Sequence, residues 1–169
     1  MKKLLWKALW KTLCGLLMLG WIPTLGVVTG ARWMTGAEVQ AQGKTPVKVT
    51  RIYTGPDGKT RVEEFDLPLK PRDKGSDVAA AIPLTTLQVR RTTPDYFLDF
   101  HPASRRQMVV TLAGESEIEL EDGRKIRLGP GSILLAEDTT GKGHISRAVP
   151  GKDRIAFDIG LAETAVIPR

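Results

Sequence analysis

Two histidines, His101 and His144, are the only imidazole side chains in this chain of 169 residues. Asp99 lies two residues before His101 in a segment that we expect to be extended, so both side chains should point to the same face of one strand. Imidazole and carboxylate groups are common ligands of Fe(II), Mn and Zn. If the fold brings the two segments together, these residues could form a metal site. The alternative is that they are ordinary polar residues, with His144 hydrogen-bonded in a turn.

Three other charged residues could bind a ligand. Arg106 could hold a carboxylate or phosphate group, because a guanidinium presents a fork of donors to either. Its alternative role is a solvated charge at the start of a strand. Glu137 and Asp138 begin a polar loop, and loops of this kind often carry functional groups. Either carboxylate could be a metal ligand or a general base, or Asp138 could bond backbone amides in a turn.

Several kinds of chemistry are excluded by the sequence. The single cysteine, Cys14, lies near the N-terminus, so the rest of the chain has neither a disulfide nor a cysteine nucleophile. The chain has no G-x-S-x-G elbow and no phosphate-binding G-x-x-x-x-G-K-[ST] loop. Five of the 25 Lys and Arg residues but only one of the 19 acids lie in residues 1–41, which leaves the remainder nearly neutral. Nucleic acid is therefore not an expected partner.

The elements that must position these residues are predicted to be short strands. Alternating apolar and polar residues are separated by turn signals such as Gly55-Pro56-Asp57-Gly58 and Asp122-Gly123. A loop is expected over 68–76, and at most one helical turn over 79–81. The predicted strands span 47–54, 61–67, 83–91, 96–101, 107–112, 115–121, 125–128, 132–137, 144–149 and 154–159. Many short strands without a long helix predict an all-β sandwich or barrel.

Two runs of the sequence resemble the motifs of the cupin superfamily. Gln107–Gly123 resembles the first motif, a strand leading to Gly114 and then a hairpin with a second glycine. Leu128–Glu137 resembles the start of the second motif, and His144 stands where that motif has its histidine. The resemblance implies a double-stranded β-helix, also called a jelly-roll barrel. It implies a core over 96–169 and an N-terminal β extension over 42–95.

The same resemblance implies where a ligand would bind. Many cupins hold a divalent metal with three histidines and a glutamate, and the family places both histidines of this chain at one cavity. Here Gln107 stands at the glutamate position, and Asp99-Phe100-His101 replaces His-x-His. The metal ligands implied are His101, His144, Asp99 and Gln107, for Fe, Mn or Zn. Gln107 also joins Arg106, Glu137 and Asp138 as a predicted ligand-binding residue.

Residues 1–41 have the layout of an export segment. Lysines in the first eleven residues precede the uncharged stretch 13–31, and Val39-Gln40-Ala41 offers small residues for a cut after Ala41. All four tryptophans lie in this segment. We expect a signal peptide and a secreted or periplasmic domain. The alternative is an uncleaved membrane anchor that holds the domain outside the cytoplasm.

Three functions are compatible with these features. The first is an exported cupin-type barrel that binds a small molecule without catalysis. The second is a metal-dependent enzyme, such as a dioxygenase, isomerase or hydrolase, that uses His101 and His144. The third is a structural or partner-binding envelope protein. A homodimer is also expected from the resemblance.

Overall fold

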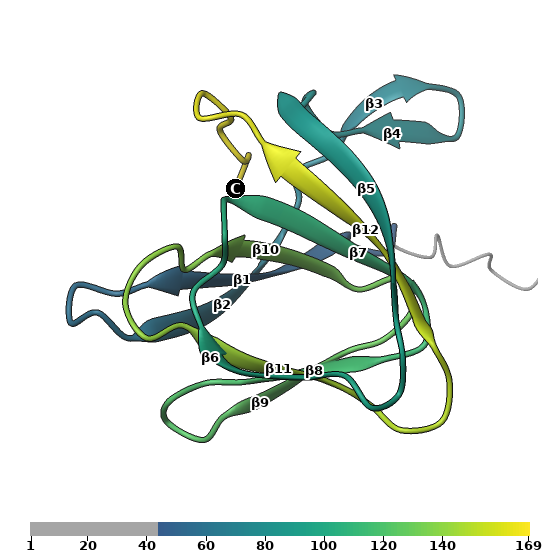
Figure 1. Ribbon diagram of the computed structural model, residues 1–169. Helices are drawn as coiled ribbons and strands as arrows, with labels where there is room; N and C mark the ends of the chain where they lie inside the picture. The colour runs from purple at the N-terminus through teal and green to yellow at the C-terminus, as the bar shows by residue number, and fades with distance from the viewer. Residues whose placement is uncertain (1–43) are drawn as a thin grey trace, which may run out of the picture. The chain divides into compact units, whose positions relative to one another are not determined.

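The computed structural model describes residues 44–169, and the regular structure in this part is entirely β (Figure 1). The predicted all-β class is therefore confirmed for these residues, whereas the predicted export segment lies outside them. Between residues 44 and 169 there is no helix with the length and hydropathy needed to cross a bilayer. The strands are β1 (Lys48–Thr54), β2 (Thr60–Asp66), β3 (Lys70–Asp73), β4 (Ser76–Val78), β5 (Leu84–Thr92), β6 (Phe97–His101), β7 (Gln107–Ala113), β8 (Ser116–Glu119), β9 (Lys125–Leu128), β10 (Ile133–Glu137), β11 (His144–Ala148) and β12 (Arg154–Leu161).

The larger sheet has six strands in the order β2-β1-β10-β7-β12-β5. β1 and β2 form the antiparallel hairpin that the sequence predicts. β1 also pairs with β10 in parallel, and the other pairs in this sheet are antiparallel. Strands from residues 42–95 therefore lie on both sides of three strands from residues 96–169 within one sheet.

The smaller sheet has four antiparallel strands in the order β6-β11-β8-β9, and it faces the larger sheet (Figure 1). Side chains alternate between the two faces of a strand, so every second residue points between the sheets. Apolar residues at these positions form a common core. Its members include Ile52, Val109, Leu134, Ala136 and Ala156 from the larger sheet and Ile118 and Leu128 from the smaller one.

A second apolar cluster covers the outer face of the larger sheet. Val49, Met108 and Leu135 point to that face, opposite to the common core, and are buried by Ala165 and Ile167 of the C-terminal tail. The six-stranded sheet is therefore packed on both faces in this region. For this reason its central strands are apolar at nearly every position rather than at every second one.

The loop predicted over 68–76 is wrong, because β3 and β4 form a small two-stranded sheet there. The turn between them contains Gly75 at φ 81°, a conformation that favours glycine. β3 is exposed along its length, so it lacks the apolar alternation that identifies a strand in a sequence. Backbone pairing, not side-chain burial, defines this hairpin.

Candidate functional site

A cavity of about 230 Å³ lies between the two sheets. Its walls are largely apolar, and two sets of polar residues in its lining bear on the chemistry. One group comprises His101, Gln107 and His144, and the other comprises Arg90 and Arg154. Leu98 also lines the cavity while 42% exposed, as expected for a residue beside an opening. Apolar walls with a few converging polar groups are typical of small-molecule sites.

Small side chains leave this space open. Ala136 on β10 pairs with Gln107 on β7 and faces inward, on the same face of β10 as Leu134. Ala103 and Ala148 also line the cavity, one from the loop after β6 and one from β11. Larger residues at these inward positions would fill the space between the sheets. The cavity therefore exists because alanine, and not a larger apolar residue, occupies these three positions.

The two histidines meet as the sequence analysis predicts. His144 at the start of β11 pairs with His101 at the end of β6, and their ring centroids are 4.7 Å apart. Nδ1 of His101 lies 2.8 Å from the backbone oxygen of Asp99, which can only accept a hydrogen bond. Nδ1 of His101 is therefore the donor. In the neutral ring Nε2 then keeps its lone pair, as required of a metal ligand or a general base.

His144 is oriented in the same way by a buried carboxylate. Its Nδ1 lies 2.6 Å from Oδ2 of Asp138, which also accepts a hydrogen bond from the Thr60 hydroxyl at 3.2 Å. Asp138 is 0% exposed and is not among the residues that line the cavity. It therefore contacts His144 on the side of the ring that is turned away from the cavity. A carboxylate behind a histidine fixes the tautomer and the ring orientation. Asp138 is therefore a positioning residue.

A glycine permits this close approach of β6 and β11. Gly143, directly before His144, has φ +79°, and a Cβ at this position would lie 1.9 Å from the backbone oxygen of His101. Any other residue would push the two chain segments apart. The sequence contains a signal for this contact in Gly141-Lys142-Gly143, but the signal alone does not say which segment the glycine approaches.

Asp99 does not share a face with His101, contrary to the expectation from its position. His144 pairs with His101 and Ser146 with Leu98, so β6 uses three residues where β11 uses two. This bulge reverses the alternation. Leu98 lines the cavity instead of facing outward, and Asp99 is exposed with its Oδ1 accepting the Phe100 amide at 2.8 Å. Within residues 44–169 no three His, Cys, Asp or Glu side chains are grouped to bind a metal ion.

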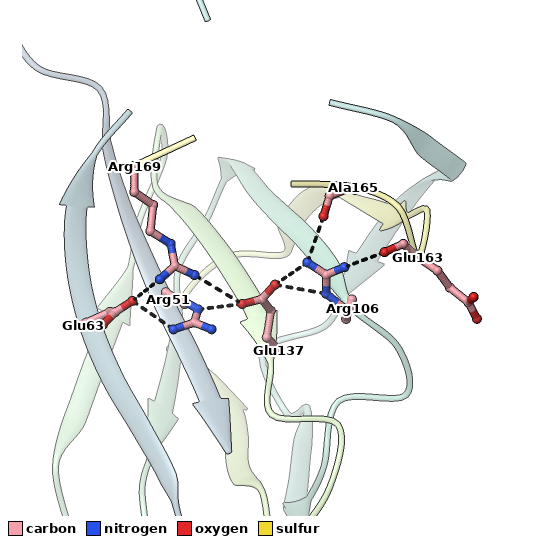
Figure 2. A network of polar contacts seen from close by, with 7 residues as sticks. All are labelled: Arg51, Glu63, Arg106, Glu137, Glu163, Ala165 and Arg169. Atoms are coloured by element: carbon pink, nitrogen blue, oxygen red, sulfur yellow. Dashed lines mark hydrogen bonds and ion pairs between the residues drawn. The ribbon is translucent and has the colours of Figure 1, made fainter. Parts of the chain in front are cut away.

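Gln107 lines the cavity together with the histidines, but the other predicted ligand-binding residues do not. Arg106 and Glu137 bind each other on the outer face of the larger sheet (Figure 2). The Arg106 guanidinium donates to Oε1 of Glu137 from Nε at 3.0 Å and from Nη2 at 2.6 Å. It also donates to the backbone oxygens of Glu163 and Ala165. Arg106 therefore attaches the C-terminal tail to the sheet.

Glu137 is the centre of this outer-face network. Nε of Arg51 donates to its Oε2 at 2.6 Å, and Nη1 of Arg51 donates to Glu63 (Figure 2). Arg169 of the tail donates to Glu63 and lies 3.8 Å from Glu137. Burial opposes ionisation of Glu137, but the hydrogen bonds from Arg106 and Arg51 outweigh it and hold the pKa of this carboxyl below its ordinary value.

Sequence reasoning missed the three arginines that line the cavity, Arg90, Arg147 and Arg154. Arg154 begins β12, where Ala156 and Asp158 are the next residues on the same face of the strand. In alternating strands, the charged residues of a segment are normally the solvent-facing ones. Here Ile159 and Leu161 of β12 belong to the outer cluster, whereas Arg154 lines the cavity on the same side of the sheet as Ala156 of the common core. Only the pairing of β12 between β5 and β7 reveals this reversal.

Arg90 from β5 forms an ion pair with Asp158, with Nε 2.9 Å from Oδ2. Arg154 is 5% exposed and donates from Nη2 to the Thr111 hydroxyl at 2.9 Å. Burial lowers the pKa of Arg154, and the charge of Arg90 lowers it further. The cavity therefore has a cationic region that is built entirely from buried and half-buried strand residues.

No model of a known protein family matches the chain, and no curated protein matches its sequence. The functional conclusion therefore depends on the fold and on the residues that line the cavity.

Proposed function

We propose that this chain is an exported cupin-type domain that binds a small molecule in the cavity between its two sheets. The observation that carries the proposal is the cavity itself, about 230 Å³ with largely apolar walls and a polar lining that includes both histidines, Gln107, Arg90 and Arg154. An apolar cavity of about 150 Å³ is enough for a benzene molecule. The space therefore suits a ring-sized ligand with polar substituents.

The cupin-type assignment is supported by the turns at the motif positions. Gly114 has φ +67° and a Cβ there would lie 2.5 Å from the backbone oxygen of Asp153, so this position requires glycine. Gly123 and Gly131, at φ +80° and +84°, occupy the other two turns that the resemblance identifies. Two facing sheets, antiparallel except for the pair β1 and β10, are close to the two-sheet arrangement of a jelly roll.

The binding proposal predicts opposite effects for two alanines of the common core. Ala136→Leu should fill the cavity, abolish binding of ring-sized compounds, and leave the free energy of unfolding unchanged or raised. Ala156→Leu is the matched control. Ala156 is 0% exposed and does not line the cavity, so the added atoms should cost ~1–3 kcal/mol.

Ligand-observed NMR with neutral aromatic compounds such as benzyl alcohol measures the binding, and urea unfolding measures the stability. Binding that survives in Ala136→Leu would place the ligand elsewhere. A loss of stability in Ala136→Leu equal to that in Ala156→Leu would mean that the cavity is not open in solution.

A metal-dependent enzyme is a second candidate. Nδ1 of each histidine is hydrogen-bonded, which leaves the Nε2 lone pair of each free to bind a metal. In this case His101 and His144 would be ligands, Gln107 could add an amide oxygen, and the metal would polarise a substrate or activate water. Elemental analysis of purified protein tests this candidate. Stoichiometric Fe, Mn or Zn that disappears in both His101→Ala and His144→Ala would support it. Protein that stays metal-free after incubation with each ion would contradict it.

A further inference from the structure

Arg154 is a buried cation without a carboxylate of its own. Within residues 44–169 its only side-chain hydrogen-bond partner is the neutral Thr111 hydroxyl. Its Nε is buried and has no hydrogen-bond partner in this part of the chain. A buried charge that lacks a counter-ion is strongly unfavourable, because burial removes the water that would solvate it.

The nearest carboxylate is already engaged. Asp158 is paired with Arg90, whose Nη2 also donates to it at 3.5 Å. Among the described residues, Arg90 and Arg154 form no ion pair with any other acid. Arg90 and Arg154 line the cavity and Asp158 does not, and the three groups together carry one net positive charge. Arg147, the other arginine of the lining, is already paired with Glu117 and Glu119.

We propose that the cationic region formed by Arg90 and Arg154 binds the carboxylate group of the ligand. This proposal rests on the small-molecule binding proposed above and adds the chemical class of the ligand. A guanidinium fork matches a carboxylate in shape and charge. The single net positive charge also favours a carboxylate over a phosphate monoester, which carries about −1.5 to −2 at neutral pH.

The position of the arginines also orients the ligand. Arg154 is bonded to Thr111 on β7, and Gln107 lies four residues earlier on the same strand. At ~3.3 Å per residue, these two β7 positions are about 13 Å apart. Both regions line the same cavity. A ligand with its carboxylate at Arg154 would therefore direct its other end toward His101 and His144.

The probe for this site is acetate, compared with its neutral analogue acetamide and with inorganic phosphate. Binding is followed by NMR on protein with ¹⁵N-labelled arginine, where the Nε–H signal of Arg154 is assigned by its loss in Arg154→Gln. We expect a saturable shift of this signal with acetate, a weaker response to phosphate and none to acetamide.

Three charge variants give expected changes of different sign. Arg90→Gln frees Asp158 to pair with Arg154, and should weaken acetate binding by roughly tenfold or more. Arg154→Gln keeps a donor for Thr111 but removes the charge, so acetate should no longer shift the remaining arginine signals. Asp158→Asn removes the competing carboxylate and should strengthen acetate binding. Arg91→Gln is the matched control, because Arg91 is exposed and adjacent to Arg90 on β5; it should leave the affinity unchanged.

The outcomes separate this inference from the proposed function. Equal responses to acetate and acetamide, or an unchanged affinity in Arg90→Gln and Asp158→Asn, would overturn the carboxylate site. If benzyl alcohol still binds in the cavity in that case, small-molecule binding stands without it. Saturable acetate binding in a protein that takes no ring-sized compound would support the anion site and contradict the larger ligand pocket.

Discussion

The contact between Asp138 and His144 shows how one buried residue determines what a cavity residue can do. Asp138 is fully buried and its Oδ2 contacts both His144 and Thr60. Because the carboxylate holds the Nδ1 proton, the Nε2 lone pair of His144 is the one left for a ligand, a metal or a proton. The chemistry of the cavity therefore depends on a residue that does not touch it.

Replacing Asp138 with alanine should lower the free energy of unfolding by roughly 2–3 kcal/mol, because two buried donors lose their acceptor. Asp99→Ala is the matched control. Within residues 44–169 the only hydrogen bond of this exposed aspartate's side chain is with the Phe100 amide, and its loss should cost about 0.5 kcal/mol or less. Urea unfolding of both variants measures the difference. Equal losses would mean that the Asp138 contacts contribute little to stability.

At the scale of single residues the sequence predicts the cavity only in part. The meeting of His101 and His144 and the place of Gln107 follow from motif positions. The position of Asp99 does not, because a bulge depends on how β6 pairs with β11 and not on local sequence. The position of Arg154 is not predicted for a related reason. In a sequence, a charged residue that faces inward has the same pattern as one that faces solvent, and only the neighbouring strands distinguish the two.

The strand β10 illustrates how one element serves two sites. Ala136 faces the cavity, whereas Glu137, the next residue, faces outward to the network that holds the C-terminal tail. A change at the end of β10 can therefore affect the tail without reaching the cavity. Arg106 and Glu137, which the sequence suggested as ligand-binding residues, contribute instead to this structural attachment.

The network predicts how stability depends on pH. The fold lowers the pKa of Glu137 from an ordinary value of 4.5, so the unfolded chain takes up the proton at a higher pH than the folded one. The stability that ionised Glu137 contributes is therefore fully present above about pH 4.5. It is lost as the pH falls through the lower pKa of the folded state.

Glu137→Gln should lower the free energy of unfolding at pH 7 by roughly 2–3 kcal/mol, somewhat below the value for a fully buried pair. It should also flatten the decline of stability in acid. Glu64→Gln is the matched control, because Glu64 is exposed and its ion pair with Lys48 is long. Thermal unfolding between about pH 3 and pH 7 tests this. A decline equally steep in Glu137→Gln would assign the acid sensitivity to other groups.

At this scale most strands are where the sequence predicts them. The alternation and the turn glycines are local signals, so β5 to β12 agree with the predicted segments to within a few residues. The parallel pairing of β1 with β10 is not local, since it joins segments about eighty residues apart. β3 and β4 lack a buried face, which explains why their sequence does not reveal them.

For the whole molecule, the edge of the larger sheet is the place where a second copy would bind. β5 is the outermost strand there, and its outward residues Leu87 and Val89 are 55% and 67% exposed. Antiparallel pairing of two β5 strands would satisfy the open edge and cover these residues. The homodimer expected from the sequence is therefore proposed to form through β5.

Val89→Lys should convert the dimer to a monomer in light scattering. Val166→Lys, at an exposed apolar residue of the C-terminal tail, is the matched control and should leave the mass unchanged. A wild-type protein that is monomeric at all concentrations would contradict the proposal. A dimer that resists Val89→Lys would place the interface elsewhere.

The proposed export can be tested with the protein's own fluorescence. Every tryptophan lies within residues 1–41, so cleavage after Ala41 would leave a mature domain that contains tyrosine but no tryptophan. Tryptophan emission from protein isolated from the envelope or the medium would contradict that cleavage. Its absence would support a removed signal peptide over a retained anchor.

The strand order of the larger sheet has a consequence for how the chain folds during synthesis. β1 is among the first strands to be made and β12 is the last, yet both flank the central pair β10 and β7. The sheet cannot be completed until almost the whole chain has left the ribosome. Folds with such long-range pairing are slow to form. A chain that stays unfolded throughout its translation remains thin enough to pass through a membrane channel, as the proposed export of this domain would require.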